Sequence, residues 1–155
     1  MAGEIDARLE ELGIELPEPA VPVANYVAYV VTGNLIFVSG QVPVVGGEFK
    51  YVGKVGGDIS IEDGQAAARL CGINIIAQLK KALDGDLDRV TRVVKLGGFV
   101  NSTPDFTGQP QVINGVSDLI GEVFGDKGKH ARAAVSAGSL PVGVAVEVDA
   151  VVEFA

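Results

Sequence analysis

Hydrophobic residues follow two periods along the chain, one typical of strands and the other of helices. Short apolar runs bounded by turn residues predict strands at 26–31, 35–39, 90–100, 132–137 and 144–153, with a further short strand at 49–52. Apolar residues at helical spacing predict helices at 4–12, 60–83 and 111–124. Ser60, followed by acidic residues in the first turn, is a suitable N-cap for the second of these helices.

The order of these elements indicates an α+β fold. Helices alternate with strands in the middle of the chain, but hairpins stand at both ends, which favours a mixed sheet with two helices packed on one face. The other face of the sheet is also apolar, and a second copy of the chain is the simplest cover for it. We expect residues 1–22 to form an N-terminal helix and a proline-rich connector, and residues 23–155 to form a single domain.

The amino-acid composition favours an oligomer and argues against nucleic-acid binding. The chain has 155 residues, of which 48% are hydrophobic, more than a small monomer readily buries. Its net charge of −8 opposes binding to phosphate backbones, so we expect no nucleic-acid partner. Cys71, the single cysteine, excludes an intrachain disulfide and a cysteine-based zinc site, and is better read as a buried apolar residue than as a nucleophile. His130, the single histidine, stands in a Gly/Lys turn and is expected to be solvated.

We expect no membrane span and a cytoplasmic location. Residues 1–12 are charged and lack the apolar core of a signal peptide. The run at 26–45 is the most apolar of the chain, but turn residues at 32–34 and 39–41 interrupt it, so two strands explain it better than a membrane helix. No cluster of metal ligands and no nucleotide-binding pattern is present, so we expect neither a metal nor a cofactor.

Arg132 is the most informative charged residue. It stands in an otherwise apolar strand, where a cation is costly to bury without a partner. Its planar guanidinium suits a ligand carboxylate, which it can bind through two parallel hydrogen bonds. The alternative is a structural ion pair with Glu147 or Asp149 on a neighbouring strand, and such pairs are the more common use of a cation.

Other polar positions also have two interpretations. Glu147 shares a strand face with Asp149, where it could position a water molecule or simply face solvent. Tyr26 begins the first predicted strand and could line a site or pack with its hydroxyl satisfied. Gly40 could let the backbone approach a ligand, or mark a bulge. Asn114 precedes a glycine inside a helix, a locally unfavourable pair that suggests a reason beyond helicity.

Taken in order, three segments resemble the RidA/YjgF family. They are Asn-Tyr-Val at 25–27, Gly-Asn-Leu-Ile-Phe-Val-Ser-Gly-Gln-Val-Pro at 33–43, and the block at 131–150, in which Arg132 is followed by Leu140-Pro141 and Glu147. The resemblance covers nearly everything from Val23 onward, and the chain resembles a divergent subgroup because several positions depart from the usual pattern.

The resemblance implies a chorismate-mutase-like fold, a homotrimer built as a trimeric barrel, and ligand clefts between subunits. Well-known members of the family are 2-iminobutanoate/2-iminopropanoate deaminases, which hydrolyse imine or enamine intermediates to 2-oxo acids and ammonia without a cofactor. Other members are named endoribonuclease L-PSP or translation inhibitor, and some lack deaminase activity.

The resemblance also assigns roles by position. Arg132 matches the arginine that holds the substrate carboxylate, and Glu147 matches an acidic residue that helps to hold water. Three residues match cleft-lining positions: Tyr26, Gly40 and Asn114. Ala134 stands where deaminases of the family usually have a cysteine that acts mainly through its backbone, so this departure bears on the choice of substrate.

Three functions follow from these observations. The first is hydrolysis of 2-imino or enamino acids in a cleft between subunits, with Arg132 and Glu147 as the catalytic pair. The second is non-catalytic binding of a small carboxylate by a regulatory protein that uses the same cleft. The third is an endoribonuclease or translation inhibitor, as in the family's older naming, and the acidic charge weighs against it.

Overall fold

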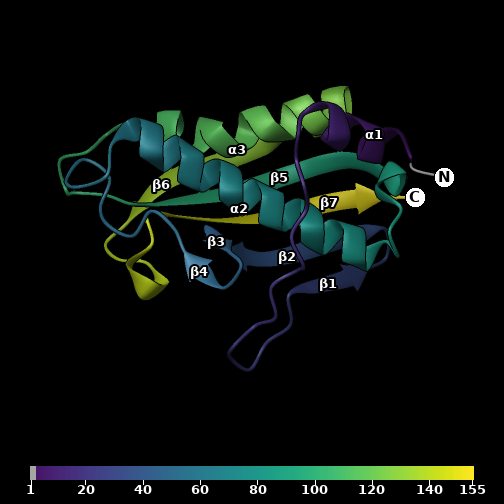
Figure 1. Cartoon of the computed structure of the whole chain (residues 1–155), viewed down its shortest axis with the longest axis horizontal. Helices are drawn as coiled ribbons and strands as arrows, with labels where there is room; N and C mark the ends of the chain where they lie inside the picture. The colour runs from purple at the N-terminus through teal and green to yellow at the C-terminus, as the bar shows by residue number, and fades with distance from the viewer. Residues whose placement is uncertain (1–2) are drawn as a thin grey trace.

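The computed structural model describes residues 3–155, so residues 1 and 2 of the predicted N-terminal region lie outside it. Figure 1 shows the arrangement of the elements. The helices are α1 (Glu4–Glu11), α2 (Ile61–Ala82) and α3 (Gln109–Phe124), with short 3₁₀ turns η1 (Leu87–Arg89), η2 (Gly125–Gly128) and η3 (Pro141–Gly143). The strands are β1 (Tyr29–Thr32), β2 (Leu35–Gln41), β3 (Val44–Val45), β4 (Glu48–Phe49), β5 (Val90–Asn101), β6 (Ala131–Ala137) and β7 (Val146–Phe154).

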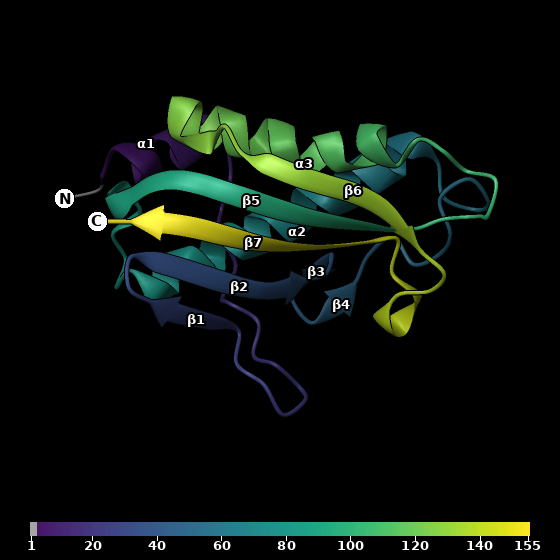
Figure 2. The same cartoon turned by 180° about the vertical axis from the view of Figure 1, so that it is seen from behind.

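The main sheet has the strand order β1-β2-β7-β5-β6. β5 and β6 run parallel, whereas the other neighbouring strands of this sheet are antiparallel. α2 and α3 lie across one face (Figure 1), and the view from behind shows the opposite face without a helix on it (Figure 2). The predicted mixed sheet with two helices on one face is therefore confirmed.

The alternation of residues along strand β7 distinguishes the helix-covered face of the main sheet from its uncovered face. Its alternate residues from Val146 to Val152 are buried under the helices, and the residues between them, including Glu147 and Asp149, are only half-buried on the uncovered face. Phe37 and Val135 also face that side, and 45% and 47% of their respective surfaces are exposed. The uncovered face is thus apolar with two central carboxylates, as the alternation predicts.

The helices approach each other closely. Ser60 caps α2 as predicted, since its hydroxyl oxygen accepts a hydrogen bond from the Asp63 N–H at 3.1 Å. A Cβ added at Gly115 in α3 would collide with the backbone carbonyl of Gln65 in α2. This contact explains the glycine after Asn114 inside a helix, because a side chain there would force the two helices apart.

Helix α1 is attached to the same core as the sheet. Ile5 and Leu9 are buried in that core. The Asp88 carboxylate accepts hydrogen bonds from the N–H groups of Ile5 and Glu4, both at 2.9 Å, and these two bonds lower the pKa of Asp88. The Lys80 ammonium adds a salt bridge to Asp6 at 3.0 Å. The domain division at residue 22 stays a prediction.

Two strand predictions were wrong at their ends. The first strand begins at Tyr29 rather than at Tyr26, because residues 23–26 form bends and the ladder with β2 ends at the Tyr29–Val38 pair. The predicted strand at 49–52 is instead the two-residue strand β4 at 48–49. Gly46 and Gly47, with φ of 58° and 80°, form a tight turn that pairs β4 with the equally short β3. Both differences lie next to the candidate site described below.

Candidate functional site

Arg132 lies on the edge strand β6, on the side of the sheet that faces the helices. Its Nη1 donates a hydrogen bond to the Ser117 hydroxyl at 3.0 Å, and its Nη2 donates to the Pro110 carbonyl at 3.1 Å. Both acceptors belong to α3 and both are neutral. The helix therefore fixes the direction of the guanidinium without cancelling its charge.

His130 extends this network behind Ser117. The His130 Nδ1 lies 2.6 Å from the Gly128 carbonyl, and its Nε2 lies 2.9 Å from the Ser117 hydroxyl. Because a carbonyl only accepts, Nδ1 carries the hydrogen, and in the neutral ring Nε2 accepts from the Ser117 hydroxyl. Ser117 then uses a lone pair for Arg132. The expectation that His130 is simply solvated was wrong, since the ring is half-buried and both nitrogens are engaged.

The guanidinium of Arg132 has no carboxylate partner among residues 3–155. The predicted alternative, a structural ion pair with Glu147 or Asp149, is wrong because β5 lies between β6 and β7 and both acids point to the opposite face of the sheet. An arginine has five N–H donors, of which two are used here. The remaining donors and the full positive charge are free for a ligand anion.

Two further predicted residues lie beside Arg132. Asn114 stands on the same face of α3 as Pro110 and Ser117, at spacings of four and three residues, and its side chain is exposed. Ala134 follows Arg132 by two residues on β6, so it faces the same side and is half-buried. We call this group the arginine half-site: Asn114, Ser117, His130, Arg132 and Ala134.

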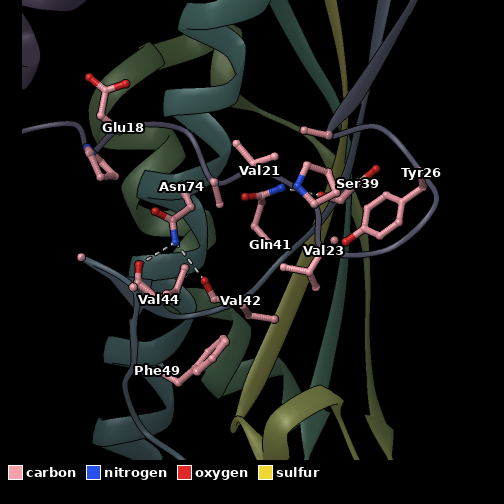
Figure 3. Close-up of a pocket in the computed structure, with 17 residues that line it drawn as sticks. Glu18, Val21, Val23, Tyr26, Ser39, Gln41, Val42, Val44, Phe49 and Asn74 are labelled. Carbon is pink, nitrogen blue, oxygen red and sulfur yellow. Dashed lines mark hydrogen bonds between the residues drawn. The ribbon is translucent and has the colours of Figure 1, made fainter.

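Tyr26 and Gly40 lie in a different place, on a cavity of about 800 Å³ shown in Figure 3. Its walls are the segment at 17–28, which includes the end of the proline-rich connector, the end of β2 with the residues that follow it at 39–44, and the β3–β4 hairpin at 46–49. Asn74 of α2 completes the lining. We call this space the connector cavity. Tyr26 is 54% exposed.

Buried amides hold the walls of the connector cavity in place. The Asn74 Nδ2 donates to the carbonyls of Val42 and Val44, at 2.9 and 3.1 Å (Figure 3). The Gln78 Nε2 donates to the Ala20 carbonyl at 2.9 Å and so fixes the connector to α2. Sequence reasoning missed these two residues, although polar amides four residues apart in an apolar helical segment are a signal of such a role.

Glu147 lies against Gly40 on the uncovered face of the sheet. A Cβ added at Gly40 would stand 2.7 Å from the Glu147 Oε1. Burial raises the pKa of Glu147, and the nearby charge of Asp149 raises it further. Burial also raises the pKa of Asp149, although the Gly97 N–H and the Lys95 ammonium oppose that shift. The cavity half-site is Tyr26, Gly40 and Glu147, together with the connector cavity.

The chain does not bring the two half-sites together. Gly40 is on β2 and Arg132 is on β6, and β7 and β5 lie between them. Three strand spacings amount to about 14 Å. Arg132 also faces the helices, whereas Glu147 faces the uncovered side. The predicted catalytic pair therefore does not meet within one chain.

No group of three or more His, Cys, Asp or Glu side chains is placed to hold a metal ion within residues 3–155. None of the helices described there combines the length and the apolar character needed to cross a bilayer. Cys71 is fully buried, and burial raises its pKa, so its thiol is not activated as a nucleophile.

Comparison with known proteins gives one family. A family model described as "YjgF/chorismate_mutase-like, putative endoribonuclease" matches residues 6–154. Protein TCP17 of Trypanosoma cruzi is 53% identical over 156 residues, which span 99% of this chain and 96% of that protein.

Two solved structures share the fold over nearly the whole chain. Atu1372 of Agrobacterium tumefaciens, described as having unknown function, is 50% identical with a TM-score of 0.92, over 97% of this chain and 92% of that one. A "putative endoribonuclease" of Shewanella oneidensis is 35% identical with a TM-score of 0.94, over 98% of this chain and 100% of that one.

Proposed function

Because the chain belongs to the YjgF/chorismate-mutase-like family, we propose that it hydrolyses 2-imino or enamino acids to 2-oxo acids and ammonia without a cofactor. The observation that carries this proposal is Arg132, whose oriented guanidinium is hydrogen-bonded only to neutral acceptors. Such an arrangement suits a substrate carboxylate, which takes two parallel hydrogen bonds from a guanidinium.

A second copy of the chain would complete the site. β6 is an edge strand, and an edge presents unpaired backbone groups that proteins normally cover. The uncovered apolar face of the sheet also needs a partner. In the proposed homotrimer, the arginine half-site of one copy meets the cavity half-site of the next, so that Arg132 and Glu147 act on one substrate. The three sheets would then form the trimeric barrel that the family resemblance implies.

The chemistry needs no metal or cofactor because an imine is already electrophilic. A water molecule adds to C2, the C2–N bond breaks, and nitrogen leaves as ammonia while a carbonyl forms at C2. Glu147 accepts a proton from the attacking water and passes it to nitrogen, which gives a carbinolamine, and it then passes the hydroxyl proton to nitrogen as the C2–N bond breaks, so that both hydrogens of the water leave with ammonia; this task suits a carboxyl whose pKa is raised. Arg132 holds the carboxylate in place, which makes the addition effectively unimolecular.

Tyr26, Gly40 and Asn114 line the proposed cleft, with Asn114 on the arginine side. Ala134 lies two residues from Arg132 on the same face of β6 and contributes its backbone rather than a side-chain group. A methyl group there leaves more room than a thiol beside the carboxylate.

The test is imine loss in a coupled assay. An amino-acid oxidase or a threonine dehydratase generates the imine, and trapping with semicarbazide reports how much survives. We expect the protein to accelerate imine loss, and Arg132→Ala to lower kcat/KM by about 100-fold, since losing one partner of a hydrogen-bonded charge pair costs roughly 2–5 kcal/mol. Arg92→Ala is the matched control, because Arg92 is an exposed arginine that also donates to a carbonyl.

Two results would contradict the proposal. One is an absence of acceleration with any imine; the other is an Arg132→Ala variant as active as the wild type. Thermal stabilisation by pyruvate that disappears in Arg132→Ala, without any turnover, would support the non-catalytic binding protein instead.

A further inference from the structure

We infer that the connector cavity receives the side chain of the substrate and selects imino acids with a long apolar side chain. This inference rests on the proposed function and narrows its substrate class. It comes from the size, the lining and the position of the cavity, each of which is described below.

The cavity is far larger than a small imino acid requires. Its volume of about 800 Å³ lies in the upper part of the roughly 300–1,000 Å³ range in which proteins bind drug-sized ligands. A side chain of one or two carbons would leave most of this space to water. A side chain of six or more carbons, or an aromatic ring, would bury apolar surface along the walls.

The lining favours hydrocarbon. Val21, Val42, Val44 and Phe49 contribute apolar surface around the cavity. The polar amides of the lining already donate to backbone carbonyls: Asn74 to Val42 and Val44, and Gln41 to Ser39. These amides shape the walls. Asn74 spends both of its donors in this way, so the polar capacity that remains is the Asn74 Oδ1 and part of the Gln41 amide, a small share of a lining whose side chains are mostly apolar.

The charge of the lining disfavours an acidic side chain. Glu18 is the charged residue in the lining, and Figure 3 shows it at the opposite end of the cavity from Tyr26. No lysine or arginine lines the cavity within residues 3–155. A second carboxylate on the substrate would therefore meet a like charge without a cation to bind it, which costs affinity.

The cavity also runs in the required direction. Tyr26 and Ser39 lie at one end (Figure 3), and Gly40 follows Ser39 in the lining; in the proposed trimer the arginine half-site of a neighbouring copy would hold the substrate carboxylate there. The side chain would then extend between the connector and the β3–β4 hairpin. Because Gln78 fixes the connector at Ala20, these walls are formed before the substrate arrives, and little ordering is needed on binding.

The experiment measures kcat/KM along a series of imines made by one amino-acid oxidase. The parent amino acids are alanine, 2-aminobutyrate, norvaline, norleucine, 2-aminooctanoate and phenylalanine. We expect kcat/KM to rise about fourfold with each methylene, which corresponds to the roughly 0.8 kcal/mol of a buried CH₂. The imine of glutamate should be a poorer substrate than that of norvaline.

A matched pair of variants places the effect in the cavity. Val44→Trp fills it, whereas Val45→Trp adds the same ring at the next residue, which is 44% exposed and outside the lining. We expect Val44→Trp to lower the ratio of 2-aminooctanoate to alanine activity at least tenfold, and Val45→Trp to keep it. This ratio compares two substrates on one protein sample, so partial unfolding of a variant does not change it.

The outcomes separate this inference from the proposed function. If no imine is hydrolysed, the proposed function itself is wrong. If imines are hydrolysed but kcat/KM does not rise with chain length, or both tryptophan variants change the ratio equally, the cavity does not hold the side chain. A cavity filled by a neighbouring copy would give that same flat series and would overturn the inference.

Discussion

The two half-sites are built in opposite ways. The arginine half-site is polar and stands on regular structure, with a guanidinium on β6 held by acceptors on α3. The cavity half-site is mostly apolar and is made of a connector, a strand end and a short hairpin that buried amides hold together. One half recognises charge and the other recognises shape, and neither is a complete site.

Their separation has an electrostatic consequence. If Arg132 and Glu147 were in contact within one chain, they would neutralise each other as an ion pair, and the arginine would be unavailable to a ligand. The sheet keeps them on opposite faces, so Arg132 keeps its charge and Glu147 keeps a raised pKa. An interface between copies would then bring Arg132, which binds the substrate carboxylate, to the same cleft as Glu147, which transfers the proton.

The largest expected effect tests whether the halves come from different copies. Arg132→Ala and Gly40→Val should each be nearly inactive, the second because a side chain at Gly40 meets the Glu147 carboxylate. Co-expression of the two variants should restore about a quarter of the wild-type activity, because random assembly in a closed ring pairs an intact arginine with an intact cavity at one site in four.

Activity at the background level in the co-expressed pair would show that the two half-sites do not combine across an interface between copies. Thermal unfolding of each variant checks that both fold. Tyr26→Ala can replace Gly40→Val if the latter does not fold, because Tyr26 is exposed and contributes little to the core.

A smaller effect tests how the arginine half-site is oriented. Ser117→Ala removes the hydroxyl that links Arg132 to His130. We expect KM to rise several-fold, up to about tenfold, as for the loss of one hydrogen bond of roughly 0.5–1.5 kcal/mol, with a smaller change in kcat. Ser117→Thr keeps the hydroxyl and should restore KM. Equal KM values in the alanine variant and the wild type would show that the hydroxyl does not position Arg132.

Local patterns were sufficient to predict the main elements. α2 was predicted because its N-cap, its acidic first turn and its apolar stripe all agree. β7 was predicted because strict alternation separates buried valines from Glu147 and Asp149, and the structure places both acids on one face as expected. These features depend on neighbours in sequence, which the pattern of residues contains.

Features that depend on distant pairing could not be predicted. Tyr26 lies outside β1 because residues 23–26 form bends and the ladder with β2 ends at the Tyr29–Val38 pair, an end that the apolar run through Tyr26 does not mark. His130 contacts Ser117 because β6 packs beside α3, which a Gly/Lys turn does not reveal. The separation of Arg132 from Glu147 follows from the strand order, in which β5 lies between β6 and β7.

The smallest expected effect concerns the stability cost of Glu147. Its pKa is raised in the folded chain, so the folded state holds this proton more tightly than the unfolded state does. The free energy of unfolding should therefore be highest below the ordinary glutamate pKa and should fall as pH rises through the raised value. Glu147→Gln removes the part of this fall that Glu147 causes and leaves the part from Asp149, whose pKa is also raised. We expect Tm at neutral pH to rise by about 1–3 °C, the shift that less than 1 kcal/mol gives in a chain of this length. Imine hydrolysis should fall in the same variant, because a glutamine amide cannot accept the proton of the attacking water. A gain in stability with a loss of activity is the trade-off expected of a functional residue. The control is Glu153→Gln, which lies on the same face of β7 but outside both half-sites and should keep full activity.

If Glu147→Gln left both Tm across the pH range and the activity unchanged, Glu147 would not be part of the site.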